Sequence, residues 1–111
     1  MSKTFDTYCI DAVDMADARA RIETVLSIQF VLHDSMFWGG DYYLFSSDDL
    51  GKITIRRNHN SHTGELNEPD YPDCKLVVSV NAPRNPDAVA ARLTEGGLRL
   101  LNRSIVSHGR V

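Results

Sequence analysis

Two histidines and a glutamate in the segment 56–73 have the spacing closest to that of a metal site. His59, His62 and Glu65 follow one another at three-residue steps, and imidazole nitrogens and carboxylate oxygens are common zinc ligands. Such steps gather side chains only on a helix, whereas the surrounding asparagine, glycine and proline residues are typical of a loop. We therefore expect solvated loop histidines, no bound metal and no cofactor. A metal-dependent hydrolase using His59 and His62 is the third hypothesis for the function.

The two cysteines are the other candidates for chemistry. Cys9 and Cys74 each lie in a strand-like run with apolar neighbours, where a free cysteine usually behaves as a small buried hydrophobe. No serine stands in a catalytic motif, and no glycine-rich phosphate loop follows a strand. Spacing alone leaves His59 open as a general base. We expect no enzymatic activity, and reduced thiols in preference to a disulfide.

The length and the N-terminus of the chain bear on its domain count and location. A chain of 111 residues suits a single domain, 1–111. No run approaches the roughly 18 apolar residues that a membrane span needs. The opening MSKTFDTYCIDA alternates polar and apolar residues, whereas a signal peptide has a continuous apolar stretch. We expect a cytoplasmic protein, in which cysteines are usually reduced.

Two segments predict helices. In 14–30, apolar residues recur at three- and four-residue steps after Asp14, a good N-cap. The segment 85–95 begins with Asn85 as N-cap and Pro86 at the first helical position. Two glycines follow it, and they either end the helix or bend it. The last segment, 98–106, is compatible with helix or strand.

Four segments predict strands: 8–12, 41–46, 52–58 and 74–82. Alternation within the last two separates an apolar face from a largely polar one. We expect an α+β fold of two layers, a mainly antiparallel sheet with both helices on one face, in the order βαβββα plus a possible short C-terminal element. The expected covered residues are Ile53, Ile55, Val78 and Val80, and the expected exposed residues are Thr54, Arg56, Val77 and Ser79.

Aromatic residues concentrate in DSMFWGGDYYLF, at 34–45. In a strand, Tyr43 and Phe45 share one side and Tyr42 and Leu44 share the other, so at least one pair belongs to the core. The other pair lies either on the open face or in a core that covers both sides. Trp38 precedes a glycine pair, which predicts a bend in place of a regular ladder. Tryptophan and tyrosine are enriched at binding hot spots. The sequence leaves open whether Trp38 is exposed.

Acidic residues concentrate between positions 34 and 73, where eight acids accompany three bases. The rest of the chain has seven acids and nine bases. Aspartate is a frequent turn residue, which accounts for part of this excess. The functional interpretation is that an acidic edge steers a basic protein partner. Nucleic acid is disfavoured as a partner, because binding phosphates calls for a basic stripe.

The order of these motifs resembles that of small bacterial immunity proteins from polymorphic toxin and contact-dependent growth inhibition systems. The resemblance rests on SMFWGGDYYLF, GKITIRRN, an acidic loop ending in EPDYPD, CKLVVSVN and LRLLNRS, and it covers residues 30–105. It implies a cytoplasmic protein that binds and blocks the toxic C-terminal domain of a larger effector, often a nuclease. It supplies no catalytic motif. Carried onto this chain, it implies these contacts: Trp38, Asp41, Tyr42, Glu65, Glu68, Asp70 and Tyr71.

We therefore expect a protein that neutralises a basic toxin domain through an acidic, aromatic edge. Aromatic side chains would supply buried area, and acids would match the lysines and arginines that a nuclease uses on phosphates. The alternative is a homodimeric regulatory or small-ligand-binding module that uses the open sheet face. The sequence identifies neither the toxin nor the oligomeric state.

Overall fold

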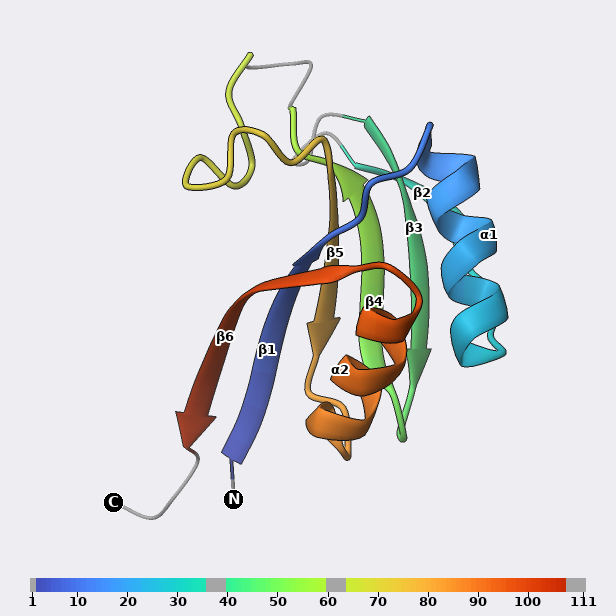
Figure 1. The fold of residues 1–111 in the computed structure, drawn as a ribbon, viewed down its shortest axis with the longest axis vertical. Helices are drawn as coiled ribbons and strands as arrows, with labels where there is room; N and C mark the ends of the chain where they lie inside the picture. Colours follow the sequence, from blue (N-terminus) through green and yellow to red (C-terminus); the bar gives the residue numbers. More distant parts are fainter. Residues whose placement is uncertain (1, 36–39, 60–63, 108–111) are drawn as a thin grey trace.

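The computed structural model describes residues 2–35, 40–59 and 64–107. Six strands form one sheet, and two helices pack with it (Figure 1). In chain order the elements are β1 (Ser2–Cys9), α1 (Met15–Leu26), β2 (Val31–Ser35), β3 (Gly40–Ser47), β4 (Gly51–Arg57), β5 (Leu76–Asn81), α2 (Pro86–Glu95) and β6 (Arg99–Ser107).

The strands lie side by side in the order β2-β3-β4-β5-β1-β6, and every neighbouring pair is antiparallel. Strands β2 to β5 follow one another as a meander. Helix α1 connects β1 to β2 at the far edge of the sheet, and α2 connects β5 to β6 past β1. In the described part of the chain, β2 and β6 are therefore the two edge strands.

The predicted class, α+β with an antiparallel sheet and two helices, is confirmed. The predicted element order was incomplete because it lacked β2. Helix α1 ends at Leu26, where Ser27 adopts a left-handed conformation with φ of 57°, whereas the predicted helix extends to residue 30. Strand β2 begins directly after it, at Val31, in a stretch for which no element was predicted. The open question about 98–106 is settled, since this segment is strand β6.

Both predicted helix N-caps are confirmed. The Asp14 side chain accepts a hydrogen bond from the backbone N–H of Asp17 (2.8 Å), and the Asn85 side chain accepts one from Ala88 (3.1 Å). These contacts satisfy N–H groups that the first helical turn leaves without partners. Neither helix in the described ranges is long and apolar enough to cross a membrane.

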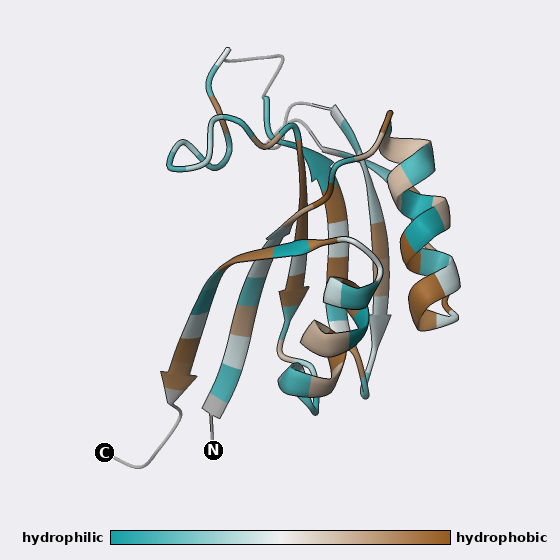
Figure 2. Ribbon diagram, viewed as in Figure 1, coloured by the Kyte–Doolittle hydropathy of each residue, from teal (hydrophilic) through white to brown (hydrophobic). Residues whose placement is uncertain are grey.

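One hydrophobic cluster joins both helices to the sheet. Ile22 and Leu26 of α1 and Val89 and Leu93 of α2 are buried in it. The strand residues that we expected to be covered are there too: Ile53, Ile55, Val78 and Val80. Figure 2 shows the corresponding hydrophobic bands on β4 and β5. The predicted strand register is therefore correct.

The opposite face of the central strands is less exposed than predicted. Thr54 is 2% exposed and Val77 is 0% exposed, so the expectation of exposure was wrong for both. Arg56 and Ser79 are half-buried, and an Arg56 guanidinium nitrogen donates to Ser79 Oγ at 2.6 Å. Periodicity reports only which residues share a face, and it contains no information about what covers that face.

The aromatic residues of β3 divide between the two faces as predicted. Tyr43 and Phe45 pack edge-on against Phe30, each with ring centroids 6.4 Å apart. Tyr42 stacks instead on His33 of the edge strand β2, with centroids 5.5 Å apart. Tyr43 and Phe45 thus adjoin the core, and Tyr42 lies on the other face.

Tyr8 predicts a loss of stability at high pH. Its side chain is fully buried, and burial, together with the charge of Asp6, raises the pKa of Tyr8 from 10 to about 12. Below pH 10 the phenol is protonated in both states. Between pH 10 and 12 the unfolded chain releases this proton and the folded chain retains it, so Tyr8 lowers the free energy of unfolding by up to about 3 kcal/mol. Urea unfolding of wild type and Tyr8→Phe at pH 9 and 11.5 should show this loss only in wild type, and equal losses would contradict it.

Candidate protein-binding surface

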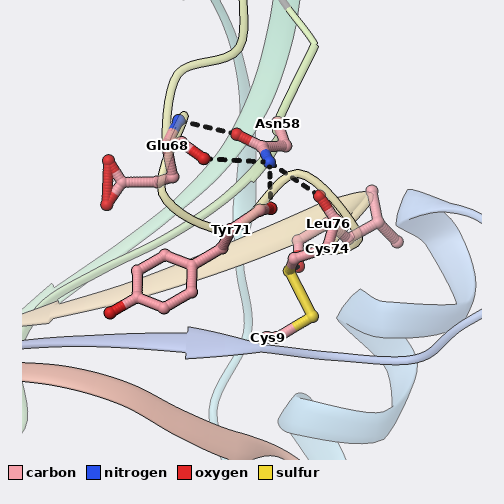
Figure 3. The surroundings of a disulfide bond; sticks show 6 residues. All are labelled: Cys9, Asn58, Glu68, Tyr71, Cys74 and Leu76. Atoms are coloured by element: carbon pink, nitrogen blue, oxygen red, sulfur yellow. Dashed lines mark hydrogen bonds between the residues drawn. A yellow bond between two sulfur atoms is a disulfide. The ribbon is translucent and has the colours of Figure 1, made fainter.

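A single buried asparagine organises the segment 64–75, which contains four of the predicted contact residues. Asn58, at the end of β4, is 1% exposed. Its amide nitrogen donates to the carbonyl oxygens of Cys74 (2.8 Å) and Tyr71 (3.0 Å), with that of Glu68 at 3.5 Å. Its side-chain oxygen accepts from the Glu68 N–H at 2.7 Å. Figure 3 shows these bonds converging on one side chain, which ties the segment to the sheet.

Backbone contacts hold the same segment at both ends. The N–H of Asn58 donates to the carbonyl of Lys75 (2.8 Å), and the N–H of Asn67 donates to the carbonyl of Asn58 (2.6 Å). The Asn67 side chain also donates to the carbonyl of Arg57 (2.8 Å). Within the segment, Cys74 N–H bonds the carbonyl of Tyr71 (3.1 Å). The segment is therefore an ordered surface, although its composition predicted only an irregular loop.

Cys9 and Cys74 form a disulfide, with Cα atoms 5.8 Å apart (Figure 3). The expectation of reduced thiols was therefore wrong. Cys74 is buried as expected but precedes β5, and Cys9 is half-buried at the end of β1. The antiparallel pairing of β1 and β5 brings the end of β1 next to the residues that precede β5. The disulfide fixes the end of the 64–75 segment to β1.

Tyr71 extends from the segment toward the edge of the sheet. Its hydroxyl donates to the carbonyl of Leu101 in β6 at 3.0 Å, and Figure 3 shows the ring pointing away from Asn58. The ring is half-buried. Tyr71 therefore links the 64–75 segment to Asn58 at the end of β4 and to β6. Its side chain remains partly accessible to solvent.

Glu68 is more buried than Glu65 and Asp70. It is half-buried, and its negative charge opposes the effect of burial, which lowers the pKa of Arg56. Its carboxylate is less accessible to a partner than those of Glu65 and Asp70, which are exposed.

Asp41 and Tyr42 lie on β3, outside the 64–75 segment. An Asp41 oxygen accepts a 2.6 Å hydrogen bond from the Arg57 guanidinium, which holds the pKa of Asp41 below its usual value. Both side chains are about half exposed, so this pair adds little stability. Arg57 is also bonded through its carbonyl to Asn67. Asp41 is therefore connected to the segment through Arg57, whereas Tyr42 is stacked on His33.

The predicted contacts fall into three groups. Glu65, Glu68, Asp70 and Tyr71 are brought together on one ordered segment, and Asp41 is linked to it through Arg57. Tyr42 lies on the sheet face. Trp38, the proposed aromatic anchor, lies outside the described residues.

The histidines give no metal cluster in the part of the chain that the structure describes. His59 is exposed and forms an isolated β-bridge with Leu66. His62 lies outside the described residues. Within these ranges no group of three histidine, cysteine, aspartate or glutamate side chains gathers in a metal-binding geometry.

Two surface cavities flank the segment that precedes α1. One, of about 410 Å³, lies between this segment and the 64–75 segment. Polar and apolar residues line it, including Val13, His59, Leu66 and Pro72. The other, of about 660 Å³, includes Val13, Lys75 and Arg99 in its lining. Val13 itself is 91% exposed. An exposed valine between two hollows is an apolar contact point that the sequence analysis missed.

Sequence reasoning also missed Asn58 and the cysteine pair. Asn58 had been treated as the last residue of a strand, and no pattern distinguishes a buried, fully bonded asparagine from an exposed turn residue. The valine had a weak signal, since Ala12 and Val13 interrupt the aspartates at positions 11 and 14.

Comparison with known proteins adds no relative. No protein family model, no curated protein and no solved structure matches this chain.

Proposed function

We propose that this protein binds and neutralises a basic, nuclease-like toxin domain, as an immunity protein does, and has no enzymatic activity of its own. The contact surface is the 64–75 segment together with Asp41 and Val13. We further propose that the fold has two layers, with both helices on one side of the sheet. In that arrangement the helices do not cover the 64–75 segment.

The observation that carries the proposal is the anchoring of an acidic segment by Asn58 and the disulfide. Binding a partner with a flexible loop costs conformational entropy, whereas an ordered loop loses little. Glu65 and Asp70 are exposed on this ordered segment. Such charges raise the association rate with a basic partner and select against acidic ones.

The alternative, a homodimeric regulatory or ligand-binding module using the open sheet face, has less support. The burial of Thr54 and Val77 leaves less apolar surface on the central strands of that face. For a metal-dependent hydrolase centred on His59, the described residues contain no group of three metal-ligating side chains.

The proposal assigns no compartment. The N-terminal sequence predicts the cytoplasm, whereas a disulfide is typical of proteins that fold in oxidising compartments. Acid precipitation of intact cells, followed by alkylation of the denatured chain, distinguishes the two, because the reagent then reaches Cys74 although this residue is buried in the folded protein. Modified Cys9 and Cys74 would indicate the cytoplasm, and unmodified cysteines would indicate an oxidising compartment.

The direct test is co-expression with the toxin domain encoded beside this gene. We expect rescue of growth and a 1:1 stoichiometry of the two chains. We expect a dissociation constant in the nanomolar range or lower, equivalent to about −12 kcal/mol or more favourable, because a small free fraction of an intracellular toxin is harmful. Failure of the wild-type protein both to bind and to protect would remove the immunity function and favour the homodimeric module.

A further inference from the structure

The outer edge of β6 has no neighbouring strand within the described chain. This strand has nine residues, Arg99–Ser107, and pairs with β1 alone. An edge strand presents unpaired backbone N–H and C=O groups to solvent, and these groups can pair with another chain. Natural proteins usually protect such an edge with a short strand, a bulge, a proline or exposed charges.

The first part of β6 has this protection. The pairing with β1 shifts between Thr7 and Tyr8, because Thr7 is opposite Asn102 and Tyr8 is opposite Leu100. Leu101 is the extra residue of a bulge, and its carbonyl accepts the hydroxyl of Tyr71. A bulge bends and twists the edge locally, which hinders pairing with another strand.

The second part of β6 lacks this protection. The residues 102–107 pair regularly with 2–7. Within them, Ser104, Ile105, Val106 and Ser107 carry no charge and include no proline. Ile105 is 65% exposed and Val106 is 42% exposed, and Figure 2 shows this end of β6 as strongly hydrophobic.

The nearest charge on the strand is already engaged within the chain. The Arg103 guanidinium donates to both carboxylate oxygens of Asp6 at 2.9 Å and to Asp87 at 2.8 Å. Asp6 is 1% exposed. Arg103 is therefore held over β1 and the start of α2, and it does not guard the free edge.

We propose that β6 pairs with the β6 of a second copy of this chain, antiparallel across a two-fold axis at Ile105. This register places Ile105 opposite its own copy, Val106 opposite Ser104, and Arg103 opposite Ser107. It joins the two exposed apolar residues to uncharged ones, and apolar pairs stabilise a sheet whereas opposed like charges destabilise it.

Registers centred nearer the start of the strand are unfavourable. Centring on Arg103 sets two arginines opposite each other, and centring on Leu101 sets Arg99 opposite Arg103. A register centred on Ser104 avoids like charges but sets Ile105 opposite Arg103. Of the registers centred on Leu101, Arg103, Ser104 and Ile105, the one centred on Ile105 avoids opposed arginines and also keeps Ile105 opposite an uncharged residue.

The other edge of the sheet is a poorer candidate. Strand β2 also has two exposed apolar residues, Val31 at 60% and Leu32 at 55%, but it has five residues, and pairing with itself about its central residue sets Leu32 opposite the charged Asp34. Pairing β2 of one copy with β6 of another is a head-to-tail contact that does not close in a dimer and leads to open chains. Pairing of β6 with itself closes. Figure 1 shows the 64–75 segment at the opposite end of the sheet from the end of β6, so the dimer leaves both segments accessible.

Sedimentation velocity of the purified full-length protein, from about 1 μM to about 1 mM, tests the dimer. Wild type should shift with concentration from the 12.4 kDa monomer to a dimer of twice that mass. Ile105→Lys should raise the dissociation constant at least tenfold. The matched control is Val31→Lys on β2, which introduces the same charge at a residue of similar exposure, 60%, and should leave the equilibrium unchanged.

Hydrogen exchange of wild type supplies a readout that needs no variant. Amides at 104–107 should become more protected as the dimer forms, and those of β2 should not. A wild-type monomer at every concentration would overturn the proposal. So would a dimer dissociated by Val31→Lys and not by Ile105→Lys, or protection confined to the sheet face or to β2. Because the assay uses no partner, its result is independent of the toxin-binding function.

Discussion

Reducing the Cys9–Cys74 disulfide should lower the free energy of unfolding by about 4 kcal/mol. The two cysteines are 65 residues apart in the chain, and cross-linking a loop of this length removes about that much conformational entropy from the unfolded state. Urea unfolding with and without dithiothreitol measures the difference. A loss of this size is a large part of the 5–15 kcal/mol that is typical of a folded domain.

The matched control for this prediction is the double variant Cys9→Ser, Cys74→Ser. It should have the stability of the reduced wild type and should not respond to dithiothreitol. Cys74 is buried and adjoins the Asn58 hydrogen bonds, so reduction should also increase hydrogen exchange in 64–75. Equal unfolding curves for oxidised and reduced wild type would show that the disulfide contributes nothing to stability.

Asn58→Ala should cost about 3 kcal/mol and release the 64–75 segment. The substitution removes a buried amide that satisfies the backbone of Glu68, Tyr71 and Cys74, and each buried polar group left without a partner costs about 1–3 kcal/mol. Urea unfolding gives the stability. Hydrogen exchange at Glu68 should rise more than exchange in β4.

Asn67→Ala is the control, because Asn67 is half-buried on the same segment and its side chain donates to the carbonyl of Arg57. We expect a cost of about 1 kcal/mol for it. The role assigned to Asn58 would be contradicted if the two alanine variants were equally stable and exchanged equally in 64–75.

Local chemistry made the helices predictable. Asp14 and Asn85 are favoured as N-caps because each side chain accepts a hydrogen bond from a backbone N–H three residues further on. Both partners of this interaction therefore lie within one short stretch of sequence. The faces of β4 and β5 were predictable for a related reason. Side-chain direction alternates along any strand, and Ile53, Ile55, Val78 and Val80 follow that alternation.

Contacts between distant residues could not be predicted in this way. Thr54 and Val77 are buried although the alternation predicted exposure, because burial depends on chain segments that fold onto the face. The disulfide depends on the pairing of β1 with β5, which places residues 65 positions apart next to each other. The predicted helix continued past Leu26 to residue 30, although the left-handed residue Ser27 ends it, and no element was predicted for Val31–Ser35, which forms β2.

The candidate site was predicted in composition and not in architecture. Glu65 and Asp70 are exposed, whereas Glu68 is half-buried. Acidic residues are easy to count, but the sequence does not show how deeply each of them is buried. The anchoring by Asn58 depends on several carbonyl groups that only the folded loop brings together.

The association rate with the basic toxin domain that the proposed function requires tests the central claim most directly. Glu65→Lys with Asp70→Lys reverses two exposed charges on the segment, and Asp48→Lys with Glu95→Lys makes the same charge change at exposed positions of the β3–β4 turn and the end of α2. Stopped-flow measurements at low and high salt compare both with wild type. We predict that the first pair slows association at least tenfold more than the second and removes most of the salt dependence, because steering charges act on the encounter. Equal association rates for the two double variants would contradict the claim that the 64–75 segment is the binding surface.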